Sequence, residues 1–207
     1  MRLEGPLQSW GASSSIQGHR PTMQFPTRSG VLGIICASLG LPRGSQEERE
    51  FLASVSVLKM QTYSYGKMTG VMNDYHTIGR ARCAIGVRAD AIITNRDYLT
   101  DAKFAIVLSG DAQLLDRIAN ALGNPVWSVG LGRKSCIPSA PIFTGMPCDS
   151  EEQSLAWCKN ARLIVEEVPL TSPGDHVIMD VPVSFNPRVF VSRKVRIVNA
   201  NFRTATA

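Results

Sequence analysis

The stretch Phe25–Gly40 carries the most specific chemistry in the sequence, at the start of an apolar run. Pro26 is excluded from a helix interior and Thr27 is a favoured N-cap, so we predict a buried helix that begins here. The unpaired amides and positive dipole of a helix start bind anions. The residues that add a hydroxyl, a charge and room for close approach are Thr27, Arg28, Ser29 and Gly30. The stretch predicts a phosphate site, with a plain core helix and an ordinary cap as the alternative.

A glycine turn later in the chain offers similar chemistry. It presents two cations and a hydroxyl, and its residues are Gly132, Arg133, Lys134 and Ser135. A polar loop before the first helix contains His19 and Arg20, which we expect to lie near the helix start. For Arg133 the structural alternative is an ion pair with a carboxylate.

Residues for catalysis or metal binding are sparse. The histidines are His19, His76 and His176. They are far apart in sequence, and the basic N-terminal part has almost no carboxylates, so neither acid–base nor metal-assisted cleavage is indicated. Five cysteines occur without a C-x-x-C pair, which suggests neither a zinc site nor a disulfide framework. We therefore predict no catalytic residues, no metal and no cofactor, and a reducing cytoplasmic location.

Charge and composition indicate one folded domain that faces a polyanion. The 207 residues are 44% hydrophobic, and the net charge is +5. Residues 1–43 contain four arginines against one acid, and no acid follows Asp180. A basic front and a basic tail favour a polyanionic partner on one face, although a solvated mixed surface is the alternative. The longest apolar run, near Val31–Leu41, is about half the length of a membrane span, so we expect no membrane association.

The order of predicted elements indicates an α+β fold with an antiparallel sheet, of the split β-α-β, ferredoxin-like kind. Predicted strands are Arg2–Leu7, Ser56–Tyr63, Lys103–Leu108, Val126–Leu131, Arg162–Val168, Val177–Val183 and Val189–Val198. Predicted helices after the first are Gln46–Val55, Asp111–Leu122 and Glu151–Asn160. We treat residues 1–207 as a single domain, with 147–207 as its strand-rich C-terminal part.

Residues 64–95 lack a clear core period and carry excess positive charge. A segment of this kind is usually a functional extension. We predict a projecting β-hairpin, or thumb, inserted in the domain. It contains Arg80 and the run Asp74–Thr77, in which Tyr75 and His76 lie.

Six short motifs occur in order along the first two thirds of the chain. They are L-E-G-P-L-Q-S-W-G (3–11), G-H-R-P-T (18–22), F-P-T-R-S-G-V-L-G (25–33), D-Y-H-T (74–77), Y-L-T-D-A-K-F (98–104) and L-G-R-K-S-C (131–136). Together they resemble the CRISPR-associated Cas-five family in its subtype I-E form. Members usually have a few more residues before the L-x-G-P motif. Here only Met1 and Arg2 precede it, so we expect a short first strand or a start inside the natural chain.

The resemblance implies a ferredoxin-like (RRM-like) fold of the RAMP superfamily with a β-hairpin thumb. It implies a non-catalytic, RNA-binding subunit of the antiviral Cascade ribonucleoprotein complex. That subunit holds the 5′ handle of the CRISPR RNA (crRNA), and it contacts the large subunit and the first backbone subunit. We further expect target DNA near the thumb.

Binding a single RNA strand requires phosphate ligands, stacking surfaces and base-edge donors. We assign the first role to the helix start and to Arg133, Lys134 and Ser135. We assign base stacking to Trp10, Tyr75 and His76. For Trp10 and Tyr75 the alternative is a position in the core or at a subunit interface. Gln8, His19 and Arg20 are assigned to base edges or the RNA backbone, and Arg80 lies in the basic thumb.

Two other classes of function stay open. Relatives in another subtype cut the repeat themselves, so a metal-independent endoribonuclease is the first. A scaffold subunit that mainly contacts protein is the second.

Overall fold

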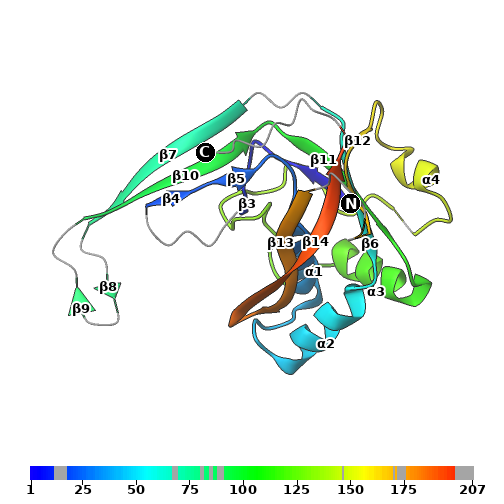
Figure 1. The fold of residues 1–207 in the computed structure, drawn as a ribbon, viewed down its shortest axis with the longest axis horizontal. Helices are drawn as coiled ribbons and strands as arrows, with labels where there is room; N and C mark the ends of the chain where they lie inside the picture. The colour runs from blue at the N-terminus through cyan, green and yellow to red at the C-terminus, as the bar shows by residue number, and fades with distance from the viewer. Residues whose placement is uncertain are drawn as a thin grey trace.

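A six-stranded antiparallel sheet forms the centre of the molecule (Figure 1). In spatial order its strands are β1 (Arg2–Glu4), β11 (Lys103–Ser109), β6 (Lys59–Ser64), β12 (Arg162–Glu167), β14 (Arg188–Ile197) and β13 (His176–Phe185). The structure is a computed structural model that describes residues 1–11, 18–66, 70–79, 82–83, 86–87, 91–145, 147–169, 171 and 176–198. The predicted antiparallel sheet is confirmed in this part of the chain.

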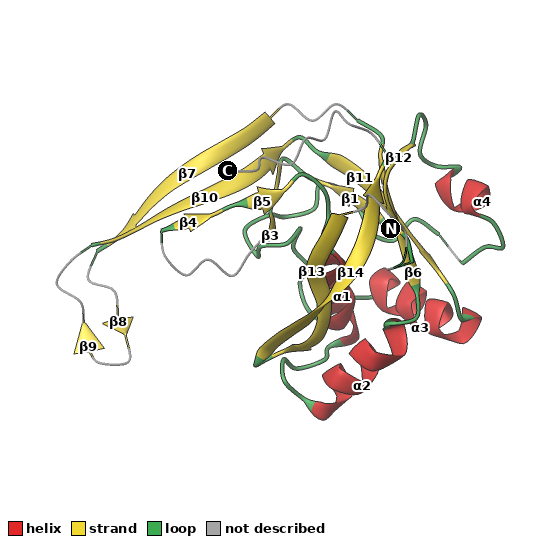
Figure 2. Cartoon of the chain, viewed as in Figure 1, coloured by secondary structure: helices red, strands yellow, loops and turns green. Residues whose placement is uncertain are grey.

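Helices cover both faces of the sheet. On one face lie α1 (Arg28–Leu39), α2 (Gln46–Val55) and α3 (Ala112–Gly123), and on the other lies the short α4 (Glu151–Leu155) (Figure 2). Alternate residues of β11 separate the two layers: Phe104 and Ile106 join the larger core, while Val107 packs in the cluster under α4. The period-2 alternation of strand side chains explains why the middle of the sheet is buried on both faces.

A long hairpin projects from this body (Figure 1). Its strands are β7 (Gly70–Ile78) and β10 (Ile92–Thr100), which also pairs with β2 (Leu7–Gln8) and, in parallel, with β4 (His19–Arg20). A separate small pair, β8 (Arg82–Cys83) and β9 (Gly86–Val87), lies at the far end of the hairpin. Another joins β3 (Trp10–Gly11) to β5 (Thr22–Met23). The paired strands begin and end later than the predicted limits of 64 and 95, since Ser64 belongs to β6 and β10 runs on to Thr100.

Most predicted elements are present. Thr27, Ser45 and Asp111 cap α1, α2 and α3 with their side chains, as expected for N-cap residues. The C-terminal strands also form, each within a few residues of its predicted limits. The predicted helix Glu151–Asn160 is shorter, because α4 ends at Leu155.

The predicted strand Val126–Leu131 is wrong. Its first backbone amides donate to the end of α1, Val126 N–H to the Ser38 carbonyl at 3.0 Å and Trp127 N–H to Ala37 at 3.2 Å. An irregular segment that includes Ile142 instead forms a hydrogen bond with the free edge of β1. Arg2 N–H donates to the Ile142 carbonyl at 2.7 Å. The Val126 and Trp127 amides therefore hydrogen-bond to the end of α1 and are not available to pair with a strand of the sheet.

No helix in the described residues is both long enough and apolar enough to cross a membrane.

Candidate nucleic-acid interface

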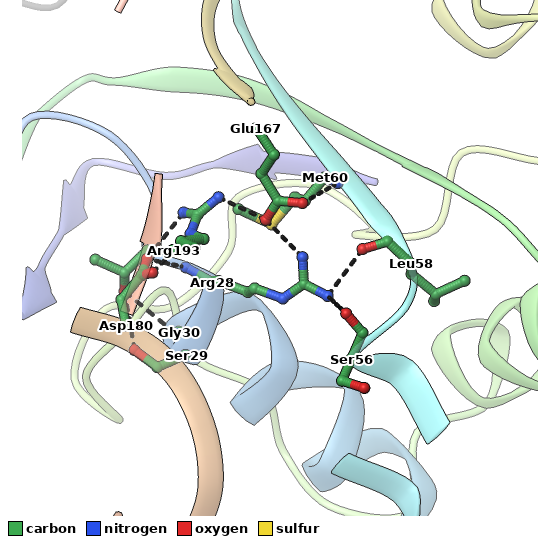
Figure 3. A network of polar contacts seen from close by, with 10 residues as sticks. Arg28, Ser29, Gly30, Ser56, Leu58, Met60, Glu167, Asp180 and Arg193 are labelled. Atoms are coloured by element: carbon green, nitrogen blue, oxygen red, sulfur yellow. Dashed lines mark hydrogen bonds and ion pairs between the residues drawn. The ribbon is translucent and has the colours of Figure 1, made fainter. Parts of the chain in front are cut away.

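The start of α1 is already occupied by a carboxylate of the same chain (Figure 3). The Arg28 backbone N–H donates to Asp180 Oδ2 at 2.7 Å, and Gly30 N–H donates to the Thr27 hydroxyl at 3.2 Å. The Ser29 hydroxyl turns back to Thr27 at 3.3 Å. A helix start binds an anion, as predicted, but the anion is Asp180. The phosphate roles predicted for Thr27, Ser29 and Gly30 are therefore corrected.

The Arg28 side chain is 3% exposed and is surrounded by acceptors. Nη1 contacts Glu167 Oε1 at 2.5 Å, and Nη2 donates to the carbonyls of Val55 and Leu58, each at 2.8 Å. The predicted phosphate contact is wrong, because this guanidinium joins the C-terminal strands to the turn after α2. No local pattern could identify its partners, which lie far away in the sequence.

A second arginine completes the buried network in Figure 3. Arg193 donates to Asp180 at 2.6 and 2.9 Å and to Glu167 at 2.8 Å. Burial alone lowers the pKa of Arg193. The bond to Asp180 and the nearby carboxylates outweigh this effect, so its pKa lies above the ordinary value. Two cations thus face two anions, and the network is balanced without an external ligand.

Gln8 and Trp10 belong to the core. Trp10 is 0% exposed, and its Nε1 donates to Gln8 Oε1 at 3.1 Å. The Gln8 amide donates to the carbonyls of Leu3 and Ala102 at 3.2 and 2.6 Å. Their predicted stacking and base-edge roles are corrected, because neither side chain reaches the surface. For Trp10 the core alternative holds.

Three strands place cations together on one face of the projecting hairpin. Arg20 of β4 pairs directly with Arg96 of β10, and Arg96 pairs with Asp74 of β7. Directly paired residues point to the same face of a sheet, and neighbouring like charges destabilise it. We call this the arginine face; its members are Arg20, Arg96, Asp74, His76, Thr94 and Tyr98. Two arginines lie beside one aspartate in this row, so the arginine face has an excess of positive charge.

Arg133 closes over the base of the arginine face. Its guanidinium lies 4.6 Å from the centre of the Tyr98 ring, and Nη2 donates to the Arg20 carbonyl at 3.1 Å. Arg133 Nη1 and Arg96 Nε have no hydrogen-bond acceptor within the described residues. Buried donors without acceptors are uncommon in proteins, so a bound anion is one way to satisfy them. The carboxylate alternative for Arg133 is not what the described residues show.

The turn that carries Arg133 depends on its glycine. Gly132 has φ 86°, and an added Cβ would lie 1.8 Å from the Ser9 carbonyl oxygen. Only glycine fits this close approach without moving the backbone. Lys134 and Ser135 follow on the exposed side of the turn.

The opposite face of the hairpin has a different character. His19, Asn95 and Tyr75 form one row across three strands. His19 Nε2 contacts Asp97 Oδ2 at 2.9 Å, whereas Tyr75 is 62% exposed. The structure therefore separates residues that were predicted together: Tyr75 and His19 from His76 and Arg20. The predicted nearness of His19 and Arg20 to Arg28 is replaced by pairing with β10.

Two members of the interface were missed by sequence reasoning. Arg96 and Tyr98 lie in β10, whose sequence I-I-T-N-R-D-Y-L-T has no simple alternation. The Y-L-T-D-A-K-F motif included Tyr98 but gave it no role. Arg80 lies outside the described residues. Within the described residues, no three His, Cys, Asp or Glu side chains gather in a possible metal site.

Comparisons with known proteins agree with the motifs. Residues 1–197 match the family CRISPR-associated protein (Cas_Cas5). The chain is 32% identical over 215 aligned positions to the CRISPR system Cascade subunit CasD of Escherichia coli (strain K12), across 96% of this chain and 94% of that protein.

Two solved structures are similar in fold. One is a chain of a CRISPR RNA-guided surveillance complex, with TM-score 0.76 and 30% identity over 96% of this chain and 88% of that one. The other is described as a crystal structure of a Cas protein, with TM-score 0.66 and 27% identity over 97% and 94%. With the family match over nearly the whole chain, these likenesses confirm the resemblance. The chain belongs to the CRISPR-associated Cas-five family.

Proposed function

We propose that the chain is a non-catalytic RNA-binding subunit of a type I-E Cascade complex and that it holds the 5′ handle of the crRNA. The observation that carries this proposal is the arginine face, where Arg20 and Arg96 are direct cross-strand neighbours and Arg133 lies beside them. Adjacent guanidinium groups suit a phosphate backbone, which offers paired oxygens to each fork. The relationship to a protein described as a Cascade subunit supports the assignment.

Other predicted contacts remain part of the proposal. Lys134 and Ser135 extend the phosphate site from the exposed turn, and His76 offers a ring beside the arginines. Tyr75 and His19 stay candidates for RNA contact from the opposite face, and Arg80 stays a candidate on the basis of the sequence alone. Stacking of a base on an aromatic ring is worth about 1–3 kcal/mol, so each ring is worth testing.

The finer fold label and the partners belong to the same proposal. The order β1-β11-β6 with α1 and α3 is consistent with a ferredoxin-like unit, and the β7–β10 hairpin is our candidate thumb, near target DNA. We place the large subunit and the first backbone subunit as neighbours. Cys36, Cys136, Cys148 and Cys158 are free thiols, which supports a cytoplasmic location.

The test measures binding of a labelled RNA with the repeat-derived handle to the purified chain. We expect Arg20→Ala and Arg133→Ala each to weaken binding about tenfold, since a charge-assisted hydrogen bond contributes roughly 1.5–3 kcal/mol. The slope of log affinity against log salt should become shallower by about 0.7 for each phosphate that a variant no longer neutralises.

Arg43→Ala is the matched control, because Arg43 is an exposed arginine in the loop between α1 and α2. Circular dichroism confirms that each variant is folded. Wild-type affinity and salt slope in the Arg20→Ala, Arg133→Ala double variant would rule out the arginine face as the handle site.

A further inference from the structure

One edge of β7 is paired and the other is open within the described part of the chain. β7 pairs with β10 along all nine of its residues, and β10 uses its other edge for β2 and β4. Figure 1 shows β7 along the rim of the projecting hairpin. The backbone N–H and C=O groups at an open strand edge are a template on which another strand can pair.

The features that usually protect such an edge are missing from β7. Proteins blunt free strand edges with proline, lysine or β-bulges. The β7 sequence G-V-M-N-D-Y-H-T-I has no proline and no lysine, and its pairing with β10 shows no shift of register. In the six-stranded sheet, by contrast, β13 carries Pro182 and shifts of register, and the edge of β1 bonds Ile142. The open edge of β7 is therefore well suited to accept a strand.

Two hydrogen bonds identify the β7 residues whose backbone faces β10. The Thr100 hydroxyl donates to the Gly70 carbonyl at 3.0 Å, and the Thr94 hydroxyl donates to the His76 carbonyl at 3.4 Å. Each threonine is the residue directly opposite in the ladder. Successive residues of a strand direct their backbone groups to opposite edges, so the odd-numbered residues of β7 bond outward. These are Val71, Asn73, Tyr75 and Thr77.

This outward-bonding row is complementary to itself when two copies of β7 run antiparallel. If the pairing is centred on Tyr75, Asn73 of each copy lies opposite Thr77 of the other, and the two tyrosines lie directly opposite. Tyr75 is 62% exposed, so its ring is available for such a contact. Aromatic pairs and hydrogen-bonding pairs across neighbouring strands stabilise a sheet.

The even-numbered residues fit the same register on the other face. Asp74 of one copy lies opposite His76 of the other, so a carboxylate meets an N–H donor, and Met72 lies opposite Ile78. Met72 and Ile78 are both exposed in the single chain. The pairing therefore covers apolar side chains and matches a charged group twice, once on each side of the two-fold axis.

The neighbouring registers lose these pairs. A pairing centred on Asp74 sets two carboxylates directly opposite, which destabilises neighbouring strands. A pairing centred on Asn73 sets Asp74 opposite Met72. A shift by a single residue would set the outward amides of one copy against residues whose backbone groups already bond β10. The register centred on Tyr75 is the one that keeps every pair compatible.

We propose that the free chain forms a two-fold dimer in which β7 pairs antiparallel with β7 of a second copy, centred on Tyr75. A two-fold contact uses the same surface on both copies, as in most homodimers. Directly paired residues point to the same face, so the two arginine faces lie side by side on one face of the joined sheet. The proposal goes beyond the proposed function and does not depend on it, since backbone groups of β7 form the contact.

A disulfide test reads the register. Cys83 and Cys148 are replaced by Ser, and Asn73→Cys is mixed with Thr77→Cys under mild oxidation. Opposite Cα atoms lie about 5.5 Å apart, within reach of a disulfide, whereas two copies of residue 73 are more than about 13 Å apart. The mixture should therefore give at least about fivefold more linked dimer on a non-reducing gel than either variant alone.

Sedimentation velocity across a range of protein concentrations measures the dimer itself. Thr77→Pro removes an outward N–H and no bond to β10, so we expect it to weaken dimerisation at least about tenfold. Thr77→Ala keeps the amide and is the matched control, with a dimer constant within about twofold of wild type. Circular dichroism checks that both variants are folded, and their handle affinity should equal that of wild type.

Several results would overturn the proposal. They are a wild-type chain that stays monomeric at every concentration, a Thr77→Pro dimer as strong as wild type, and either cysteine variant alone linking as well as the mixture. Pairing of this edge only with a different protein would also overturn it. If handle binding fails while the mixed disulfide forms, the proposed function is wrong and the dimer stands.

Discussion

Gly30 is the residue on which α1 and the buried Trp10 meet. An added Cβ would lie 2.7 Å from Trp10 Cε3 and 2.9 Å from Cζ3. We expect Gly30→Ala to lower the free energy of unfolding by about 1–3 kcal/mol, the usual cost of overpacking a core. Urea denaturation followed by tryptophan fluorescence measures this change.

Gly33 in the same helix is the control, because an alanine there should change the free energy of unfolding in the opposite direction. Its added Cβ would find Phe185 Cζ at 3.8 Å, an ordinary contact. Gly33→Ala should therefore raise stability by about 1 kcal/mol through helix propensity alone. Equal effects at the two positions would mean that the contact with Trp10 does not limit residue 30.

Removing the Arg28 side chain should damage stability and leave RNA binding intact. Arg28→Ala leaves Glu167 with one arginine instead of two, and losing one partner of a buried ion pair costs about 3–5 kcal/mol. Urea denaturation measures the loss, and handle affinity of the folded variant should stay within about twofold of wild type. Arg43→Ala should change stability by less than about 0.5 kcal/mol. A stable variant with weakened RNA binding would restore the phosphate interpretation.

At the scale of single residues, the residue types predicted the kind of interaction, but the sequence did not reveal which residues take part in it. The sequence predicted that the start of α1 attracts an anion, and it does. It could not reveal that Asp180 and Glu167 supply the charge, since these residues belong to a tail without a recognised motif. Arg20 and Arg133 were each assigned to RNA, but the sequence did not predict that they lie together. The Arg133 side chain donates a hydrogen bond to the Arg20 backbone carbonyl.

Between elements, the β1–β11 pair should respond to acid through Glu4. Burial alone raises the pKa of the Glu4 carboxyl, but Lys103 at 2.8 Å and then Arg2 outweigh it, so the pKa lies below the ordinary value. This stability is complete above the unfolded pKa of about 4.3 and is lost as the pH falls through the lower folded value. Glu4→Gln should flatten the dependence of unfolding free energy on pH below about 5.

Thermal denaturation from pH 3 to 7 measures that dependence. Glu50→Gln on the exposed side of α2 is the control and should keep the wild-type slope. An unchanged slope in Glu4→Gln would show that the carboxyl does not link the two strands in solution.

The hairpin can be shortened without removing its buried base. Tyr75 and Asn95 are directly opposite, so an Asn-Gly turn can replace residues 76–94. The base keeps Tyr98 and Leu99, which are buried. We expect the chain to fold with little loss of stability and the complex to capture target DNA at least tenfold less well, measured by gel shift. Normal capture would exclude the outer hairpin as a thumb.

Elements with strong patterns were predictable, and those held by distant backbone contacts were not. The apolar face of α3 and its Asp111 cap fixed that helix closely. Val126–Leu131 looked like a strand because it is rich in aliphatic residues, yet its amides find carbonyls of α1. The hairpin limits were displaced because β10 is paired on both sides and carries a mixed sequence.

For the molecule as a whole, we expect no nuclease activity. Metal-independent cleavage needs a base and an acid or cation on one phosphodiester, whereas His19 and His76 lie on opposite faces of the hairpin. Purified chain incubated with its repeat RNA, with and without divalent metal, should leave it intact on a denaturing gel. Specific cleavage at the handle boundary that is lost in His76→Ala or Lys134→Ala would make the endoribonuclease alternative correct.

The network around Arg28 also imposes a delay while the chain is being synthesised. Asp180 follows Arg28 by 152 residues. A ribosome that adds roughly 5–20 residues per second needs about 8–30 s to reach it. Until then the Arg28 guanidinium lacks its carboxylate partners and has only the carbonyls of the turn after α2 as acceptors within the chain. The buried network of Arg28 therefore closes only after the strands that carry Glu167 and Asp180 have been synthesised.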